Sequence, residues 1–315
     1  MPDREKKPRV KLIINPNADM GNAWKQAWSL RPIVEERADA DWAGTVYPTH
    51  AIELAKQAAK DGYDIVVAIG GDGTVHEVVN GLMQVKKRKR PKLGVVPMGS
   101  GNDFAWALGV PEKPEDALHE IVNGVAATRL IDIGVLEDTR GRKEYWDNSL
   151  SIGFGGAVTI YSHNLPLLRG FLMYLVAVIQ TIIRRHDVLG MTITTDQKTW
   201  EDQLMMLAVC NGAREGGGFL TAPDAINNDG VLNYTAVKKT SRAMMFRLIP
   251  EFMKGTHGKF KQIYMGEMLK MQIDSDSPLY LHIDGELFTD FSTDIRNLKI
   301  EILPQALEVI IPQTS

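Results

Sequence analysis

The residues best suited to chemistry lie in two glycine-rich turns. The first turn, Gly70-Gly71-Asp72-Gly73-Thr74, follows the apolar run Ile65 to Ile69 and precedes a segment of helical spacing at 75–83. Glycines let the backbone approach a ligand closely, and the start of a helix favours a phosphate. Asp72 would repel that phosphate unless a cation lay between them, so the turn favours a metal–nucleotide. The alternative is a tight strand-to-helix turn in which Thr74 caps the helix.

A second turn repeats this arrangement after the next apolar run. Residues 93–96 are apolar, and Gly99-Ser100-Gly101-Asn102-Asp103 follow them. Asn15-Pro16-Asn17-Ala18, after the run at 10–14, is a third candidate. Neighbouring strands that end in such loops build the ligand crevice of an open α/β sheet. Neither the P-loop pattern nor the GxGxxG pattern of hydride cofactors is present.

Asp284 and Glu286 form an acidic pair in the segment Leu279 to Phe288. If this segment is extended, residues two apart point to the same face, and Gly285 leaves room above them. Two carboxylates on one face could accept a hydroxyl proton and organise a cation. The alternative is an acidic hairpin, because Asp-Gly is a favoured turn pair. The spacing alone leaves both interpretations open.

The elements around these motifs predict two domains. In the first part, apolar strands alternate with helical stretches, which predicts a doubly wound α/β sheet. After about Ile133, strand-like segments predominate, and only 165–185 and 241–252 have helical patterns. We therefore predict an α/β domain over 1–133, which 296–315 could complete, and a β-rich domain over 134–295. A ligand cleft is expected between them. The strand-like segments include 191–195, 205–209, 232–237, 268–273, 279–283 and, around Pro304, two short strands within 298–311.

Composition excludes several classes of protein. With 36 basic and 39 acidic residues the formal net charge is −3, which argues against a nucleic-acid partner. The single cysteine, Cys210, lies in an apolar run and is expected to be buried, and the lack of disulfides suits a reducing compartment. The seven histidines show no zinc-binding spacing. Residues 1–11 lack the apolar core of a signal peptide, so we expect a cytoplasmic protein.

Two further segments bear on membranes. The apolar stretch 170–183 is shorter than the roughly twenty residues that span a bilayer. We interpret this stretch as a buried helix, and the wider segment 165–183 as core in preference to the lining of a lipid cleft. The basic run Lys86, Lys87, Arg88, Lys89, Arg90 predicts either a solvated loop or, with Lys254, Lys259 and Lys261, a surface that attracts anionic lipid.

Taken in order along the chain, these motifs resemble those of the bacterial lipid kinases of the diacylglycerol kinase and sphingosine kinase superfamily. The resemblance covers almost the whole chain. It implies ATP-dependent phosphorylation of a lipid hydroxyl by a protein with an NAD kinase-like first domain and nucleotide between its domains. It rests on Gly70–Thr74 with Glu77 and Asn80, on Gly99–Phe104, on Asn15-Pro16 and on Asp284-Gly285-Glu286.

The resemblance also implies roles for single residues. Glu286 would be the catalytic base and Asp284 its neighbour. Thr45 fits the nucleotide-contacting threonine of the family, and Thr49 is the alternative. Asp19 departs from the glycine of many members, and Ser100 replaces a threonine found in some. The residues that would line the nucleotide are Asn15, Pro16, Asn17, Ala18, Asp19, Thr45, Gly70, Gly71, Asp72, Gly73, Thr74, Val75, His76, Glu77, Gly99, Ser100, Gly101 and Asn102.

Two magnesium sites follow from the same resemblance. Asp72, Asp103 and Asp132 match an acidic network associated with Mg²⁺. The segment 224–231 resembles a structural Mg²⁺ loop, with ligands at the backbone carbonyls of Ile226 and Val231 and at the side chain of Asp229. Such oxygen ligands also suit Ca²⁺.

The implied partner is a lipid at a membrane surface, with transient membrane association, and the sequence is compatible with a homodimer. Diacylglycerol, phosphatidylglycerol, a sphingoid base and a polyprenyl alcohol all carry a suitable hydroxyl. One alternative is an NAD kinase, whose Asn-Asn-Glu motif is matched only loosely by residues 227–229. The other is a catalytically silent lipid-binding protein of the same fold, which would lack the acidic pair.

Overall fold

The structure is a computed structural model, and it describes residues 7–123, 127–165, 168 and 170–312. Two compact units make up the chain. Unit 1 comprises Met1–Ile131 and Gln305–Ser315, and unit 2 comprises Asp132–Pro304. Each boundary falls inside a long strand, β5 (Ala127–Asp138) or β15 (Asn297–Ile311), so these two strands contribute residues to both units.

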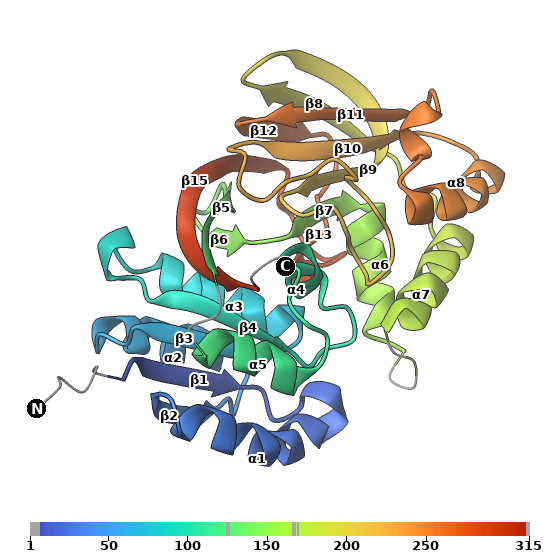
Figure 1. Ribbon diagram of the computed structural model, residues 1–315. Coiled ribbons are helices and arrows are strands. Elements are labelled where there is room, and N and C mark those ends of the chain that lie inside the picture. The colour runs from blue at the N-terminus through green and yellow to red at the C-terminus, as the bar shows by residue number, and fades with distance from the viewer. Residues whose placement is uncertain (1–6, 124–126, 166–167, 169, 313–315) are drawn as a thin grey trace, which may run out of the picture. The chain divides into compact units, whose positions relative to one another are not determined.

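Unit 1 contains a parallel sheet in the order β4-β3-β1-β2, and the end of β15 pairs with β4 (Figure 1). Every neighbouring pair among β1 to β4 is parallel. The strands are β1 (Arg9–Ile14), β2 (Asp39–Gly44), β3 (Ile65–Gly70) and β4 (Lys92–Pro97). The helices are α1 (Asn22–Glu35), α2 (His50–Lys60), α3 (Asp72–Met83), α4 (Asp103–Ala107) and α5 (Pro114–Val122), with short 3₁₀ turns at η1 (Ala18–Gly21) and η2 (Lys87–Lys89).

Helices cover both faces of this sheet. On one face, Leu12 and Ile69 pack in a core with Leu30 of α1 and Leu118 of α5. On the other face α2 and α3 pack against each other and contact β1 and β3. The strands are therefore apolar on both faces, as parallel strands in such folds are. This confirms the predicted doubly wound α/β fold.

Unit 2 is rich in antiparallel strands, as predicted. Its sheet runs β14-β13-β7-β9-β8-β12-β15, and β10 pairs with β9 and β11. The additional strands are β6 (Lys143–Trp146), β7 (Ser149–Gly153), β8 (Leu189–Thr195), β9 (Thr199–Cys210), β10 (Leu232–Lys238), β11 (Ile263–Met268), β12 (Lys270–Ser275), β13 (Leu281–Ile283) and β14 (Glu286–Thr289). The helices are α6 (Phe154–Ser162), α7 (Gly170–Arg184) and α8 (Arg242–Lys254), with a 3₁₀ turn at η3 (His257–Lys259).

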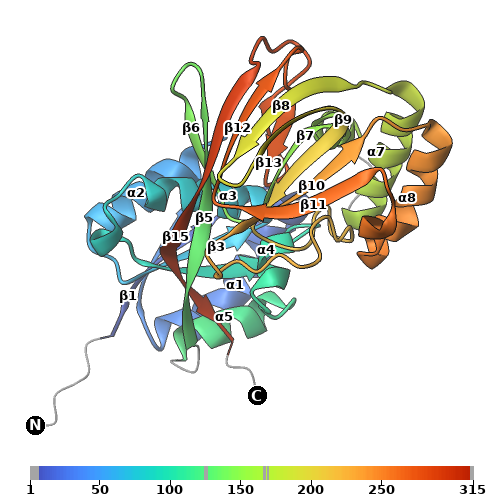
Figure 2. The ribbon, with the colours of Figure 1, turned by 90° about the horizontal axis from the view of Figure 1, so that it is seen from above.

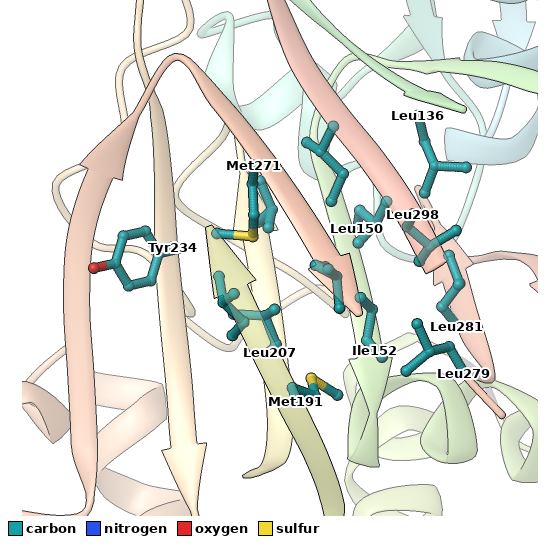
Figure 3. Packing of buried hydrophobic residues seen from close by; sticks show 14 of the residues in the cluster. Leu136, Leu150, Ile152, Met191, Leu207, Tyr234, Met271, Leu279, Leu281 and Leu298 are labelled. Carbon is teal, nitrogen blue, oxygen red and sulfur yellow. The ribbon is translucent and has the colours of Figure 1, made fainter. Parts of the chain in front are cut away.

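One large apolar core holds these strands together. Leu150 and Ile152 of β7, Leu207 of β9 and Leu281 of β13 are fully buried members of it. Figure 3 shows these side chains packed together with Met271 of β12. Each fully buried Leu or Ile contributes about 1.5–3 kcal/mol relative to an exposed one. The core therefore fixes the strands that carry the acidic pair.

Two predicted elements were wrong in detail, and one helix was not predicted. The segment 268–273 was predicted as one strand, but it belongs to two, because β11 ends at Met268 and β12 begins at Lys270. The segment 298–311 was predicted as two strands, but it is one strand that passes Pro304 with a positive φ of 50° at Gln305. Helix α6 was not predicted. Its Gly155-Gly156 pair lowers helix propensity, yet a Cβ at Gly156 would lie 2.6 Å from the carbonyl oxygen of Tyr280, so close packing requires glycine there.

Within the described ranges, no helix has both the length and the apolar character needed to cross a bilayer.

Candidate functional site

The predicted turns of unit 1 lie at one end of its sheet, because the strands they follow are parallel neighbours. The two glycine turns touch backbone to backbone. A Cβ at Gly99 would lie 2.4 Å from the Cα of Gly71. The third turn joins them, since the N–H of Asn15 donates to the carbonyl of Ile69 at 3.0 Å. Glycine at position 99 is therefore required for the two turns to meet.

The helix that follows the first glycine turn begins earlier than predicted. Helix α3 starts at Asp72, with Gly71 as its N-cap. Thr74 lies inside the first helical turn of α3. A Cβ at Gly70 would lie 2.3 Å from the hydroxyl oxygen of Thr74. The interpretation of Thr74 as the helix cap was therefore wrong. The N–H groups of Thr74 and Val75 donate to the carbonyl of Gly71, at 3.0 and 3.2 Å.

The predicted nucleotide-lining residues Val75, His76 and Glu77 of α3 are buried or hydrogen-bonded within the protein. Val75 and His76 are buried, with 2% and 4% exposure, so their side chains face the protein interior. Both carboxylate oxygens of Glu77 accept backbone bonds at the start of α2, from Thr49 at 2.8 Å and from Ala51 at 3.0 Å. Glu77 thus caps α2, and its contact with nucleotide stays a prediction.

The threonine candidates differ in position. The N–H of Thr45 donates to the carbonyl of Ile14 at 2.9 Å, which places Thr45 beside the end of β1. Thr49 has a positive φ of 73° and is tied to Glu77. In the third turn, which follows β1, the N–H of Asn17 donates to the side chain of Asn15 at 3.0 Å. The side chain of Asp19, which lies in η1 beside Ala18, falls outside the described part of the structure.

The second glycine turn is clamped by its own asparagine. The side chain of Asn102 accepts from the N–H of Gly99 and donates to its carbonyl, both at 2.9 Å. Ser100 is exposed at the tip of the turn. These bonds hold the turn in shape without a ligand.

Two acidic side chains approach each other at Gly101. A Cβ at this position would lie 2.9 Å from Oδ2 of Asp72 and 3.4 Å from Oδ2 of Asp103. The other oxygen of Asp72 accepts from the N–H of Phe104 at 3.3 Å. Carboxylate oxygens are the ligands that Mg²⁺ prefers, so this pair fits that ion. Across the described residues, no cluster of three or more His, Cys, Asp or Glu could hold a metal by itself.

The third member of the predicted acidic network, Asp132, lies in unit 2. It is fully buried, and its Oδ2 accepts from the N–H of Gly230 at 2.7 Å. Its own N–H donates to the carbonyl of Asn227 at 2.8 Å. Asp132 therefore supports the loop that was predicted to bind a structural metal. In that loop Ile226 and Asp229 are exposed, and Oδ1 of Asp229 accepts from the N–H of Val231 at 3.1 Å.

Of the two interpretations that the spacing left open for the acidic pair, the structure has the hairpin and not the extended segment. Asp284 and Gly285 form a turn with φ of 49° and 82°, and this turn joins β13 to β14. Asp-Gly is the pair that such a hairpin favours. As a result Asp284 is buried at 6% exposure, whereas Glu286 is exposed. The two carboxylates therefore lie in different environments.

The carboxylate of Asp284 accepts three backbone N–H groups. Oδ1 accepts from Asn148 at 3.1 Å and from Ser149 at 2.9 Å, and Oδ2 accepts from Asp147 at 3.2 Å. Hydrogen bonds to charged groups contribute about 1.5–3 kcal/mol each. Asp284 therefore locks the hairpin that carries Glu286 onto the start of β7.

We expect Asp284→Ala to lower the free energy of unfolding by about 3 kcal/mol, because it removes all three acceptor contacts and places alanine at a positive φ. Asp284→Asn keeps one oxygen in place and tolerates this φ, so it should cost only about 1 kcal/mol. Urea unfolding of the two variants measures the difference. Equal losses would show that these bonds do not anchor the hairpin.

Unit 2 also contains an apolar cavity of about 80 Å³. Its walls come from α6, α7, α8, β9 and β10, and Figure 2 shows α7 and α8 beside these strands. The expectation that 165–183 would be core rather than lining was therefore partly wrong. Val178 and Ile182 of α7 are buried, but they also line the cavity with Tyr174.

The carboxylate residue Glu215 is part of the lining of this apolar cavity. Its Oε1 lies 2.6 Å from Nε2 of His282, and the hydroxyls of Thr221 and Tyr174 donate to its carboxylate at 3.1 and 3.2 Å. Burial raises the pKa of Glu215, but the contact with His282 and the two hydroxyl bonds outweigh it and hold this pKa below its usual value. Neither Glu215 nor His282 was predicted as a site residue. A glutamate beside three successive glycines, 216–218, was the one signal available.

Other residues singled out in the sequence have simpler roles. Cys210 is fully buried, as expected, and burial raises the pKa of its thiol. The basic run is not uniform. Lys86 to Lys89 are exposed, but Arg90 is half-buried and donates to the carbonyls of Val85 and Ala306 at 2.9 and 2.5 Å. Arg90 therefore secures the end of β15 in unit 1.

Comparison with known proteins agrees with this arrangement. Residues 9–135 match the diacylglycerol kinase catalytic domain, and residues 148–311 match the YegS C-terminal NAD kinase beta sandwich-like domain. A diacylglycerol kinase of Bacillus subtilis is 30% identical over 289 residues, which are 88% of this chain and 89% of that protein. A protein of Chromohalobacter salexigens named "Probable lipid kinase YegS-like" is 35% identical over 280 residues, which are 84% of this chain and 81% of that protein.

A solved structure of a diacylglycerol kinase from Bacillus anthracis has the same fold. The two superimpose with a TM-score of 0.73 at 22% identity, over 98% of this chain and 99% of that chain. The glycine turns of unit 1 and the acidic hairpin of unit 2 both fall inside the matched regions. This chain therefore belongs to the family of diacylglycerol kinases and YegS-like lipid kinases.

Proposed function

We propose that this protein transfers the γ-phosphoryl group of ATP to the hydroxyl of a lipid, in a reaction that depends on Mg²⁺. The observation that carries the lipid assignment is the apolar cavity of unit 2, whose lining residue Glu215 contacts the strand that leads into the acidic hairpin. A cavity with apolar walls suits an acyl or alkyl chain. A dinucleotide would need more polar partners than this cavity offers.

The turns of unit 1 would bind the nucleotide. The backbone contact of Gly71 with Gly99 leaves no side chain between the two turns, so their N–H groups can approach phosphate oxygens. Asp72 and Asp103 would hold Mg²⁺, which neutralises charge on the phosphates when bound. The loop with Ile226, Asp229 and Val231 would hold a second, structural Mg²⁺ or Ca²⁺.

Glu286 would act as the general base. It would accept the proton of the lipid hydroxyl as the lipid oxygen bonds to the γ-phosphorus and the bond from that phosphorus to the β–γ bridging oxygen breaks, which releases ADP. Exposure of Glu286 leaves it accessible to a substrate, whereas the buried Asp284 positions it. The proposal thus assigns nucleotide binding to unit 1 and acceptance of the proton to unit 2.

The proposal includes transient attachment to an anionic membrane. The exposed cations Lys86, Lys87, Arg88 and Lys89 would supply up to about 1 kcal/mol each near such a surface. Arg90 is excluded from this role by its bonds to backbone carbonyls.

A cavity-filling variant tests the lipid assignment. Val178→Phe adds a ring to the cavity wall, so we expect a KM for long-chain diacylglycerol in mixed micelles that rises about tenfold, with a smaller change for a short-chain analogue. Leu172→Phe, on an exposed position of the same helix, is the matched control and should leave both KM values unchanged. Equal KM values for Val178→Phe and the parent on the long-chain lipid would contradict this use of the cavity.

A further inference from the structure

The buried pair His282 and Glu215 lies next to the acidic hairpin. His282 is 1% exposed and Glu215 is 7% exposed. Their side-chain atoms Nε2 and Oε1 are 2.6 Å apart. His282 belongs to β13, directly before the turn at Asp284, whereas Glu215 lies in the loop after β9. The pair therefore joins two segments that are far apart in the sequence.

The histidine contacts the turn itself. Its Nδ1 accepts the backbone N–H of Gly285 at 3.2 Å. Because Nδ1 is an acceptor, the ring proton of a neutral imidazole resides on Nε2, which faces Glu215. Gly285 is the residue between Asp284 and Glu286, and its φ is 82°. The imidazole thus bridges the carboxylate of Glu215 and the peptide group that precedes Glu286.

Glu215 is itself held on several sides. The hydroxyls of Thr221 and Tyr174 donate to it, and its backbone N–H donates to the carbonyl of Phe219 at 2.8 Å. The ring of Tyr174 packs on the adjacent loop, where a Cβ at Gly216 would lie 2.5 Å from it. The carboxylate therefore offers the histidine a fixed partner.

Burying such a pair is costly. Removal of a carboxylate from water carries a penalty of several kcal/mol, and apolar replacements of buried pairs are often no less stable. Stability alone therefore gives no reason for a glutamate and a histidine at these positions. A fixed orientation of the turn gives such a reason, since Glu215 contacts Nε2 of His282 and Nδ1 of the same ring accepts the N–H of Gly285.

We propose that Glu215 and His282 are positioning residues that fix the Gly285 peptide group and thereby orient Glu286 toward the lipid hydroxyl. This inference rests on the proposed function. Asp284 anchors one side of the turn through the amides of 147–149, and His282 anchors the other side through Gly285. With both anchors, Glu286 extends from a turn whose backbone is fixed on two sides.

The test compares disruptive with conservative variants. Glu215→Leu and His282→Leu remove the polar contacts, whereas Glu215→Gln keeps an oxygen beside Nε2 and His282→Asn keeps an acceptor for the N–H of Gly285. We expect the leucine variants to lower kcat for lipid phosphorylation by about 10- to 100-fold with KM for ATP unchanged, because small misplacements of a reacting group have effects of that size. The conservative variants should retain kcat within about threefold.

His257→Leu is the matched control, since His257 is also fully buried in unit 2 but stacks on Phe252 instead of contacting the turn. It should lower the melting temperature without lowering kcat. Folded leucine variants with the parental kcat, or conservative variants as impaired as the leucine variants, would overturn the proposal.

Amide hydrogen exchange of the peptide covering 281–289 gives a readout that needs no enzymatic activity. Exchange at Gly285 and Glu286 should accelerate in Glu215→Leu and His282→Leu but not in Glu215→Gln. Unchanged exchange in the leucine variants would overturn the positioning role. A parent protein that phosphorylates no lipid would instead refute the proposed function, and the exchange data would still decide whether the pair holds the turn.

Discussion

Glu286→Gln is expected to lower kcat for lipid phosphorylation by about 10²- to 10⁴-fold, which is the usual contribution of a general base. The amide is similar in size to the carboxylate but cannot accept the hydroxyl proton. Glu286 is exposed at the first position of β14, so the substitution should leave the fold intact. Initial rates with Mg-ATP and diacylglycerol measure the loss of catalysis. Calorimetry measures the affinity for ATP separately.

The affinity for ATP should stay within about twofold of the parent value, because the nucleotide is assigned to unit 1. Glu267→Gln, at an exposed position of β11 in the same unit, is the matched control and should have no effect on either quantity. A Glu286→Gln protein with the parental rate would refute the role of this carboxylate.

Gly99→Ala should impair nucleotide binding. The added Cβ would lie 2.4 Å from the Cα of Gly71, and backbone atoms cannot yield as a flexible side chain can. The two glycine turns must therefore separate, at a cost of about 1–3 kcal/mol typical of overpacking. We expect ATP affinity to fall about tenfold or more, since 1.4 kcal/mol corresponds to a factor of ten.

The control for this variant is Gly44→Ala. Gly44 ends β2 in the same sheet, but a Cβ there would meet ordinary contacts at 3.6 and 3.7 Å. It should retain ATP affinity. If Gly99→Ala bound ATP as tightly as Gly44→Ala, the assignment of these turns to the nucleotide would be contradicted.

The fold of unit 1 could be predicted from the sequence because its signals are local. Runs such as Ile65 to Ile69 are apolar at every position, which is typical of strands buried on both faces. The runs are followed by Gly70-Gly71, by Asn15-Pro16 or, after Pro97-Met98, by Gly99, and a helical stretch comes next in each case. The meeting of the turns then follows from parallel pairing alone.

The conformation of the acidic segment could not be decided from its local sequence. The spacing along 279–288 allowed either an extended segment with Asp284 and Glu286 on one face or an Asp-Gly hairpin. The Asp-Gly turn forms because three backbone amides from 147–149 donate to the buried carboxylate of Asp284 and stabilise it. These amides are distant from Asp284 in the sequence. The contact of Glu215 with His282 could not be predicted for the same reason. It exists only once β9 and β13 both lie beside β7.

The reaction proposed for this protein is the phosphorylation of a lipid hydroxyl with ATP. The most direct measurement incubates the protein, Mg²⁺ and γ-labelled ATP with total bacterial lipid extract or, in parallel, with NAD, and identifies labelled products by mass spectrometry. We expect label in a lipid phosphate, none in NADP, and loss of the lipid product with Glu286→Gln. Label in NADP alone, or consumption of ATP without any labelled lipid, would contradict it.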